Sequence, residues 1–560
     1  LQLRFKDVPI LAAPSLTFPL NSARQSGLLA PIIGIDTVSG IEVASPYYWN
    51  IAPNRDATIA PTYMARRGTD LGTEFRYLET QYRGTLRTHY MPDDRLRERD
   101  RWAFSLQHQD ALARTGLPAG ANLKLDLNRV SDDNYWRDFT RNTGSLTSRL
   151  LANDGTLGWG QGPVSLQARV LKWQTLQDPT AIITPPYDRL PQLVARYNAS
   201  RLPAGLEAGV EADYTSFHSL VSLTGQPNAQ RTYLLAQASR PWQTPGAFIT
   251  PKLQLHTRGY SFDAPLPTGE RSAQVTVPTF SLDSGLVFER DTSLFGRGLV
   301  QTLEPRAFYV RTPYVDQNFL PRYDTGSKDF NFATIYSENA FNGNDRIADN
   351  NLLTLGVTTR LFDADTSAEL GRVGVAQRVR LSEQRVTLNA SDPPVVERLS
   401  DILVGGAVNW TRAWATDATV QYNPETRRSE RVTLAARYNP SPYRVVSAAY
   451  RMQRTLSEQL DFGWQWPIND LWGGGDREAE SAWSRTRGQG LGPDRWYSVG
   501  RMNFSLTEKR LVDTIIGFEY DAGCWLGRVV FERLQSTLST SNTRLFFQME
   551  FVGLARVGSS

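Results

Sequence analysis

The sequence predicts an all-β fold, a large antiparallel transmembrane β-barrel of about 26 strands, and three observations favour it. From Gly27 onward, strands of about ten residues alternate apolar and polar side chains, as expected for a wall between lipid and a wet lumen. Aromatic residues make up 11% of the chain, with 14 Trp and 22 Tyr, and these residues favour strands and membrane interfaces. Mean hydropathy is −0.39 and no apolar run approaches the roughly 18 residues of a spanning helix, which excludes a helical membrane protein.

Two regions follow from this pattern. Residues 1–26 have a β-like sequence interrupted by prolines, and we expect them to be the end of a preceding domain. The chain starts directly with this strand-like sequence and shows no signal peptide, so we expect a fragment that lacks its N-terminal part. Residues 27–560 are expected to form the barrel.

The stretch 27–68 predicts the first three or four barrel strands. Residues alternate between two faces in 56–63, and 36–40 and 50–55 have the composition of tight turns. Pro31 and Pro46 lie inside the first two predicted strands, where each removes a backbone donor and is tolerated only at an edge or a weak seam.

The later strands repeat the alternation. We expect one face to point to the lumen with Glu74, Arg76, Arg83, Arg87, Lys124 and Asp126, and the other to lipid with residues such as Phe75 and Leu125. Long connections are predicted at 131–144, 177–190, 313–350, 382–400 and 467–495. Loops of this length are commonly the extracellular ones, and the aromatic-rich 313–350 is a candidate lid over the lumen.

Sites for chemistry are not evident in the sequence. The four histidines are isolated and show no metal-ligand spacing, and there is no GxSxG, HExxH or phosphate-loop motif, so we expect neither an enzyme nor a cofactor. A barrel-borne Ser-His hydrolase remains a distant alternative, since such residues assemble in space. The net charge of +4 is too small to indicate nucleic-acid binding. Cys524 is the single cysteine and is either a free thiol or half of a disulfide with a partner outside this sequence.

Several long motifs resemble the LPS-assembly protein LptD family, also called the organic solvent tolerance protein family. The resemblance covers the entire chain, in the family's order, and its most specific pieces are LTFPLNSARQSGLLAP (16–31), PYYWNIAPNRDATIAPTYMARRG (46–68), PPYDRLPQL (185–193), LEPRAFYV (303–310), DFNFATIYSENAFNGNDRIADNNLLTLGVTTR (329–360) and GFEYDAGCWLGRVVFER (517–533).

The resemblance implies a 26-strand barrel in the Gram-negative outer membrane that inserts lipopolysaccharide into the outer leaflet. It implies a lipoprotein plug like LptE in the lumen, and a periplasmic β-jellyroll that docks onto a bridge protein like LptA. Residues 1–26 would be the end of that jellyroll, and Cys524 would pair with a cysteine before it.

A physical argument supports a sideways exit for the lipid. Exposing acyl chains to water costs about 0.8 kcal/mol per CH₂, so a lipid with several chains does not cross a wet pore freely. The first strand (28–35) has to pair with the last (545–554), and Pro31 and Pro46 weaken this seam, so we expect a lateral gate there. The alternative function is a large outer-membrane channel or porin, which needs no weak seam.

Overall fold

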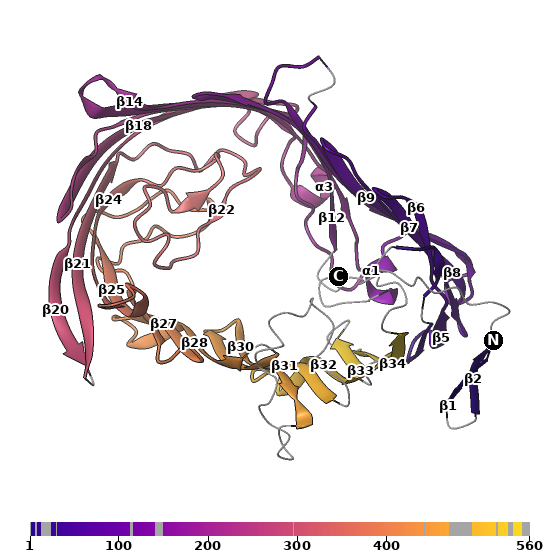
Figure 1. The fold of residues 1–560 in the computed structure, drawn as a ribbon. Helices are drawn as coiled ribbons and strands as arrows, with labels where there is room; N and C mark the ends of the chain where they lie inside the picture. The colour runs from indigo at the N-terminus through magenta and orange to yellow at the C-terminus, as the bar shows by residue number, and fades with distance from the viewer. Residues whose placement is uncertain are drawn as a thin grey trace.

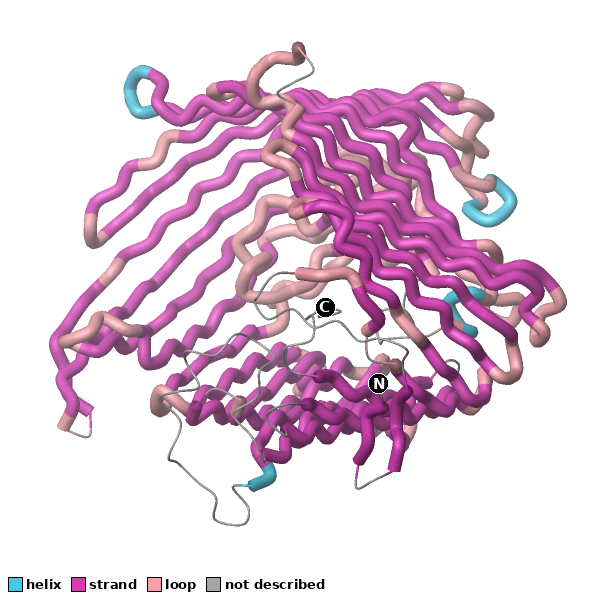
Figure 2. Tube along the Cα trace, turned by 45° about the vertical axis from the view of Figure 1, so that its right-hand side comes forward, coloured by secondary structure: helices cyan, strands magenta, loops and turns pink. Residues whose placement is uncertain are grey.

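The computed structural model describes residues 2–5, 8–12, 24–29, 31–112, 116–139, 149–294, 296–441, 443–469, 495–521, 525–535 and 541–551. Most of these residues belong to one closed antiparallel barrel, seen along its opening in Figure 1 and turned by 45° in Figure 2. The predicted all-β barrel is confirmed.

The barrel wall contains thirty strand segments. They are β3 (Gly27–Leu28), β4 (Ile32–Asp36), β5 (Gly40–Ala44), β6 (Tyr47–Ala52), β7 (Arg55–Met64), β8 (Gly68–Leu78), β9 (Tyr82–Asp94), β10 (Arg99–Asp110), β11 (Asn122–Val130), β12 (Leu150–Gln161), β13 (Val164–Thr175), β14 (Asp188–Leu202), β15 (Leu206–His218), β16 (Ala229–Ser239), β17 (Trp242–Thr244), β18 (Ala247–Phe262), β19 (Ser272–Leu286), β20 (Phe288–Leu294), β21 (Arg297–Thr312), β24 (Asn350–Asp363), β25 (Glu369–Arg380), β26 (Ile402–Asn409), β27 (Trp414–Asn423), β28 (Arg428–Ser441), β29 (Arg444–Gln453), β30 (Ser457–Pro467), β31 (Arg495–Ser505), β32 (Arg510–Asp521), β33 (Trp525–Gln535) and β34 (Ser541–Phe551).

Four of these segments continue a strand across a break, which gives 26 barrel strands. The first strand is β3 with β4, the second is β5 with β6, and the pairs β16 with β17 and β19 with β20 are broken in the same way. The number agrees with the prediction, because each antiparallel hairpin uses a nearly constant length of chain.

The two faces of the wall follow the predicted alternation. Glu74 lies opposite Arg87 in the β8–β9 ladder, and both Arg83 and Lys124 lie opposite Gln109. The side chains on this face point to the lumen, while Phe75 and other residues in alternate positions lie on the outer face. A period of two is sufficient to assign both faces once the strands are located.

The connections divide between two ends of the barrel. We call the end that carries the connections 131–149, 176–187, 313–349 and 381–401 the loop end, and the opposite end the turn end. The connection 467–495, most of which lies outside the described residues, follows a strand of the opposite direction, because β30 runs toward the turn end whereas β11, β13, β21 and β25 run toward the loop end. Strand direction is fixed by position in the hairpin series, and connection length alone does not reveal it.

Little regular secondary structure lies outside the barrel wall in the described part of the chain. Short helical turns α1 (Tyr135–Asp138), η1 (Pro203–Gly205) and α3 (Val221–Thr224) occupy connections, and β22 (Gly326–Ser327) pairs with β23 (Phe341–Asn342) inside the 313–349 segment. The strands β1 (Gln2–Phe5) and β2 (Val8–Ala12) form a separate two-stranded sheet. The assignment of 1–26 to a jellyroll stays a prediction. No helix in the described part of the chain is long and apolar enough to cross a membrane.

Candidate functional site: the seam between the first and last strands

The barrel closes through a short ladder between β4 and β34. Five residue pairs make this ladder, from Arg544 opposite Asp36 to Gln548 opposite Ile32, whereas eleven pairs join β33 to β34. Among the described residues, it has the fewest pairs of any ladder between neighbouring strands of the barrel. The predicted pairing of first and last strands is therefore confirmed, and it covers only the part of the first strand nearest the loop end.

Three prolines lie in a row across the first three strands. Pro31 lies in the break between β3 and β4, Pro46 in the break between β5 and β6, and Pro61 within β7. The N–H of Leu29 donates to the Pro46 carbonyl at 2.8 Å, and the N–H of Ser45 donates to the Pro61 carbonyl at 3.1 Å. Each proline lacks the donor that a continuous ladder needs, so this row interrupts the sheet.

The break changes the register of the first strand. On the loop-end side of Pro31, Ile32 lies opposite Ala44, whereas on the turn-end side Leu28 lies opposite Tyr47, a shift of one residue. Pro31 and Pro46, which were predicted inside the first two strands, thus lie at breaks of those strands. On the turn-end side of the break, the described pairing of β3 is with β6, and the residues that the register of β4 and β34 would place opposite β3 lie outside the described part of the chain.

The seam has an apolar outer face and a polar inner face. On the outer face Ile33, Ile35, Leu545 and Phe547 are between 40% and 59% exposed, as lipid-facing side chains are in a barrel without its lipid. On the inner face Arg544 of β34 reaches across the first strand and bonds Glu42 of β5 at 2.7 Å. Opening the seam therefore separates an ion pair on one side and apolar contacts on the other.

At the loop end the seam is held by hydroxyl and backbone contacts. The N–H of Thr37 donates to the Thr543 carbonyl at 3.0 Å, and the Thr37 hydroxyl both donates to Asn542 and accepts from the Thr543 N–H. In the same turn, the Asp36 carboxylate accepts the N–H groups of Val38 and Ser39. The tip of the first hairpin is thereby fixed to the last strand.

A buried charge cluster anchors this tip from the other side. Arg67 donates to the Ser39 hydroxyl at 3.2 Å and to Asp94 at 2.6 Å. Arg101 in turn bonds Asp94 and the carboxylate of Asp138 in α1, at 3.1 and 2.7 Å. We call these residues, with Asp132, which also bonds Arg101, the loop-end latch.

The charges of the latch are balanced although they are buried. Both Arg67 and Arg101 are 1% exposed, and their guanidinium groups lie 5.1 and 4.7 Å from the Phe139 ring. Burial alone would raise the pKa of Asp138, but hydrogen bonds from Arg97 and Arg101 bring that pKa below its usual value. Asp138 therefore stays ionised at neutral pH, and the ion pairs of the two arginines hold the first hairpin in place.

The segment 313–349, which we call the luminal loop, folds into the barrel. Figure 1 shows it inside the ring of strands, where β22 is labelled. Its Tyr323 stacks on Phe217 of β15 with ring centroids 4.8 Å apart, and its Leu320 and Ile347 join a buried apolar cluster with Tyr260 of β18. The predicted lid is thus an inward-folded loop that occupies part of the lumen beside these strands.

A fully buried arginine fixes the luminal loop to the wall. Arg231 of β16 donates to both carboxylate oxygens of Asp324 and to Asp345, each at 2.7 Å. Burial acts to raise the pKa of Asp324, but the charge and hydrogen bonds of Arg231 hold that pKa well below its usual range. Burial and the nearby Asp324 carboxylate instead raise the pKa of Asp345.

Several important residues were not predicted. Pro61 follows Pro46 by the same interval that separates Pro46 from Pro31, a spacing that points to prolines side by side in three neighbouring strands. Arg67, Arg231 and Arg544 carry no signal that separates them from other inward arginines, because their partners are distant in sequence. Cys524 lies outside the described residues, between β32 and β33, which meet at the turn end.

No group of three or more His, Cys, Asp or Glu residues in the described chain is arranged to hold a metal ion. The histidines have separate neighbours: His89 contacts Asp70 at 2.9 Å, and His256 contacts the Tyr233 hydroxyl at 2.9 Å. The residues that stand out are those that hold or weaken the wall.

The fold and the weak seam define a large outer-membrane-type β-barrel with an interrupted closing ladder. Residues 99–472 match the family described as LPS transport system D, and residues 1–193 match that described as LptD protein. The chain belongs to the LPS-assembly protein LptD family.

Relatives support this assignment over the whole chain. The sequence is 60% identical to the LPS-assembly protein LptD of Acidovorax sp. (strain JS42), covering 99% of this chain and 68% of the relative. It is 59% identical to that of Paracidovorax citrulli (strain AAC00-1), covering 99% and 67%. A solved structure of the alcaligin outer-membrane receptor FauA from Bordetella pertussis aligns over 95% of this chain and 76% of its own, with 6% identity and a TM-score of 0.28.

Proposed function

We propose that this protein inserts lipopolysaccharide into the outer leaflet of the Gram-negative outer membrane through lateral opening between β4 and β34. Lipopolysaccharide assembly and the outer-membrane location follow from the family, whose work is transport rather than catalysis. The observation that carries the lateral route is the closing ladder of five pairs, which ends at the row of prolines.

The two faces of the seam suit an amphipathic cargo. Acyl chains that leave through the seam move past the apolar side chains of Ile33, Ile35, Leu545 and Phe547 and stay in apolar surroundings. They thereby avoid exposure to water, which costs about 0.8 kcal/mol per CH₂. Saccharides that stay on the lumen side meet the polar inner face, with Arg544 and its neighbours. One opening in the wall thus serves both halves of the lipid.

The seam is also the weakest place in the wall. Each ladder hydrogen bond contributes about 0.5–1.5 kcal/mol net, so five pairs hold far less than the eleven pairs of the adjacent β33–β34 ladder. The other ladders join strands that are consecutive in the chain, and most are closed by short turns. Separation of the first and last strands breaks the fewest ladder pairs of any two neighbouring strands in the described wall and leaves the hairpins intact.

Further partners belong to the same proposal. A barrel of this size is too wide for its own side chains to fill, and the luminal loop packs mainly against β15–β19 and β24–β26. We infer that a lipoprotein plug like LptE lies against the opposite inner wall. A photocrosslinker at the inward Lys124 should capture it, and one at the outward Leu125 should not; equal capture at both would contradict a luminal plug.

The turn end is proposed to face the periplasm. The first strand starts there and the β1–β2 sheet precedes it, so a jellyroll that ends at residue 26 would open onto this end of the lumen and would dock a bridge protein like LptA. Cys524 follows β32 at the same end, and an intramolecular disulfide would need a partner outside the 560 residues, because the sequence has one cysteine.

A disulfide across the seam tests the lateral route. Gly34 and Phe546 are directly opposite, and a Cβ at Gly34 lies 3.4 Å from the Cβ of Phe546, close to the roughly 3.5–4.5 Å of a disulfide. We expect Gly34→Cys with Phe546→Cys, in a Cys524→Ser background, to stop surface delivery of lipopolysaccharide, and reductant to restore it.

The matched control joins two strands that do not meet at the seam. Gly517 and Val530 are opposite in the β32–β33 ladder and also face the lumen, so Gly517→Cys with Val530→Cys should leave delivery unchanged. Normal delivery through a seam whose crosslink is verified by mass spectrometry would rule the lateral route out, and would favour a channel.

A further inference from the structure

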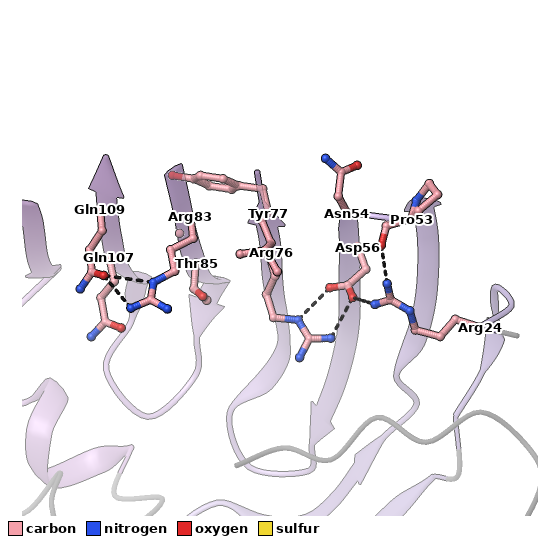
Figure 3. Close-up of a pocket in the computed structure, with 12 residues that line it drawn as sticks. Arg24, Pro53, Asn54, Asp56, Arg76, Tyr77, Arg83, Thr85, Gln107 and Gln109 are labelled. Carbon is pink, nitrogen blue, oxygen red and sulfur yellow. Dashed lines mark hydrogen bonds and ion pairs between the residues drawn. The ribbon is translucent and has the colours of Figure 1, made fainter. Parts of the chain in front are cut away.

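A polar pocket of about 430 Å³ lies on the inner wall at the turn end. Figure 3 shows its side chains on neighbouring strands, and we call it the turn-end pocket. It is lined by Arg24, Pro53, Asn54, Asp56, Arg76, Tyr77, Leu78, Arg83, Gly84, Thr85, Gln107 and Gln109. Its volume is in the range of sites that hold a small molecule or a group of one.

One carboxylate in the pocket, that of Asp56, already pairs with two arginines. Asp56 accepts two bonds from Arg76, at 2.7 and 3.1 Å, and one from Arg24 at 3.0 Å. The Tyr48 hydroxyl donates to the same carboxylate at 3.1 Å. Glu74 also lies 3.7 Å from Arg76, but it is bound more closely by Arg87, at 2.7 Å, so the arginines of this group outnumber its acids.

The third arginine has a neutral partner only. Arg83 donates through Nε and Nη2 to the amide oxygen of Gln109, at 3.0 and 2.9 Å, and no carboxylate among the described residues pairs with it. Its neighbour on the same face of β9, Arg87, is bound by Glu74 at 2.7 Å. The amide holds the Arg83 guanidinium in a fixed position and leaves its charge uncompensated.

We propose that the turn-end pocket binds a phosphate group on the saccharide headgroup of lipopolysaccharide as the lipid enters the lumen. This inference rests on the proposed function. Arginine suits a phosphate because its planar fork can donate two bonds at once, and the free Nη1 of Arg83 and the exposed edge of Arg76 both border the pocket.

The place of the pocket agrees with such a role. Arg24 precedes β3 and reaches into the pocket, so the site adjoins the turn-end part of the first strand, beyond the break at Pro31. A headgroup held there would keep its acyl chains beside this part of the first strand. The pocket would thus position the lipid before it leaves the barrel.

The test uses the full-length protein with its lipoprotein partner and a photocrosslinker in place of Gln107. The probes are purified lipopolysaccharide and the same lipopolysaccharide after chemical removal of its phosphates. We expect the phosphorylated form to give more adduct at low concentration, Arg83→Gln to reduce that adduct about fivefold or more, and Arg83→Lys to retain most of it. The matched control, Arg87→Gln, removes a charge from the same strand and face and should leave the adduct unchanged.

Three results would overturn the proposal: equal adducts with and without phosphate, the same yield in Arg83→Gln and Arg87→Gln, or an adduct made mainly with the lipoprotein. The last would make the pocket a docking surface for the plug. The barrel locked between Gly34→Cys and Phe546→Cys separates this question from the gate. If no lipopolysaccharide is captured at the pocket although the locked seam still blocks delivery, the pocket proposal alone is overturned. If lipopolysaccharide is captured at the pocket but the locked barrel still delivers it, the gate proposal alone is overturned.

Discussion

Removal of the Arg231 guanidinium should release the luminal loop from the barrel wall. Arg231 is 0% exposed, its three hydrogen bonds to Asp324 and Asp345 are each 2.7 Å long, and its guanidinium lies 4.9 Å from the Phe217 ring. Arg231→Met retains much of the side-chain volume but leaves two carboxylates without their counter-ion. The cost falls on the docked loop, because an undocked loop exposes both acids to water.

The expected magnitude is large. Removal of one partner from a buried ion pair costs about 3–5 kcal/mol, which corresponds to about a 150- to 5,000-fold shift toward the undocked loop. The apolar contacts of Tyr323 and Leu320 remain and oppose full release. We therefore expect a barrel that still forms, with a loop that leaves the wall often enough to be detected.

Two measurements on the purified barrel detect this change. Trypsin should cut after Arg322 and Lys328 faster in Arg231→Met than in the wild type, and conductance in planar bilayers should rise. Arg169→Met is the matched control, since Arg169 is an inward arginine paired with Asp154 on strands away from the loop. Replacement of Asp324 and Asp345 by Asn in the Arg231→Met background should slow cleavage again. An unchanged cleavage pattern and conductance in Arg231→Met would refute the anchoring role of this arginine.

Three further predictions concern the seam, the single cysteine and acid. Pro31→Ala with Pro46→Ala restores two backbone donors and should slow lipopolysaccharide delivery several-fold without unfolding the barrel; unchanged delivery rates would contradict a role for the breaks. The full-length protein should shift on non-reducing gels, and Cys524→Ser should abolish the shift, whereas a wild type that never shifts would leave the thiol free. Because the pKa of Asp324 is lowered in the docked loop, its contribution is present above about pH 4 and is lost as the pH falls through the lowered pKa. The raised pKa of Asp345 acts in the opposite direction, because protonation of Asp345 as the pH falls toward about 4 favours the docked loop. Conductance should therefore not rise between pH 7 and about pH 4, and should rise below, where Asp324 becomes protonated; a rise already near pH 6 would contradict the assignment.

The wall of the barrel was predictable because its signal is local. A strand with one lipid face and one lumen face repeats every two residues, so the faces of Glu74 and Phe75 follow from the sequence alone. Closure between the first and last strands follows from the absence of edges in a barrel. The family motifs then identify the cargo.

The contacts that hold the seam and the luminal loop were not predictable in this way. Arg231 meets Asp345 across more than a hundred residues, and Arg544 meets Glu42 across nearly the whole chain. Such pairs depend on strand register and on the path of a loop in the lumen, and neither has a periodic signal. The prediction found Pro31 and Pro46 but missed Pro61, because Pro61 fits the alternation of β7 and disturbs only the neighbouring ladder.

If the seam opens as proposed, the loop-end latch would set the order in which the parts of a lipid leave. A seam fixed at Thr37 and broken at Pro31 would open as a wedge, with its apex at the latch and a free edge near Gly27, about 30 Å away at about 3.3 Å per residue. A rotation of about 10° at the apex then widens the free edge by about 5 Å, roughly the spacing of one strand, and hardly moves the apex. Acyl chains can slip out early through the wide part, whereas the saccharide meets the narrow part last. Release of the buried arginines around Ser39 would then be the final event of each passage, and its rate would limit turnover.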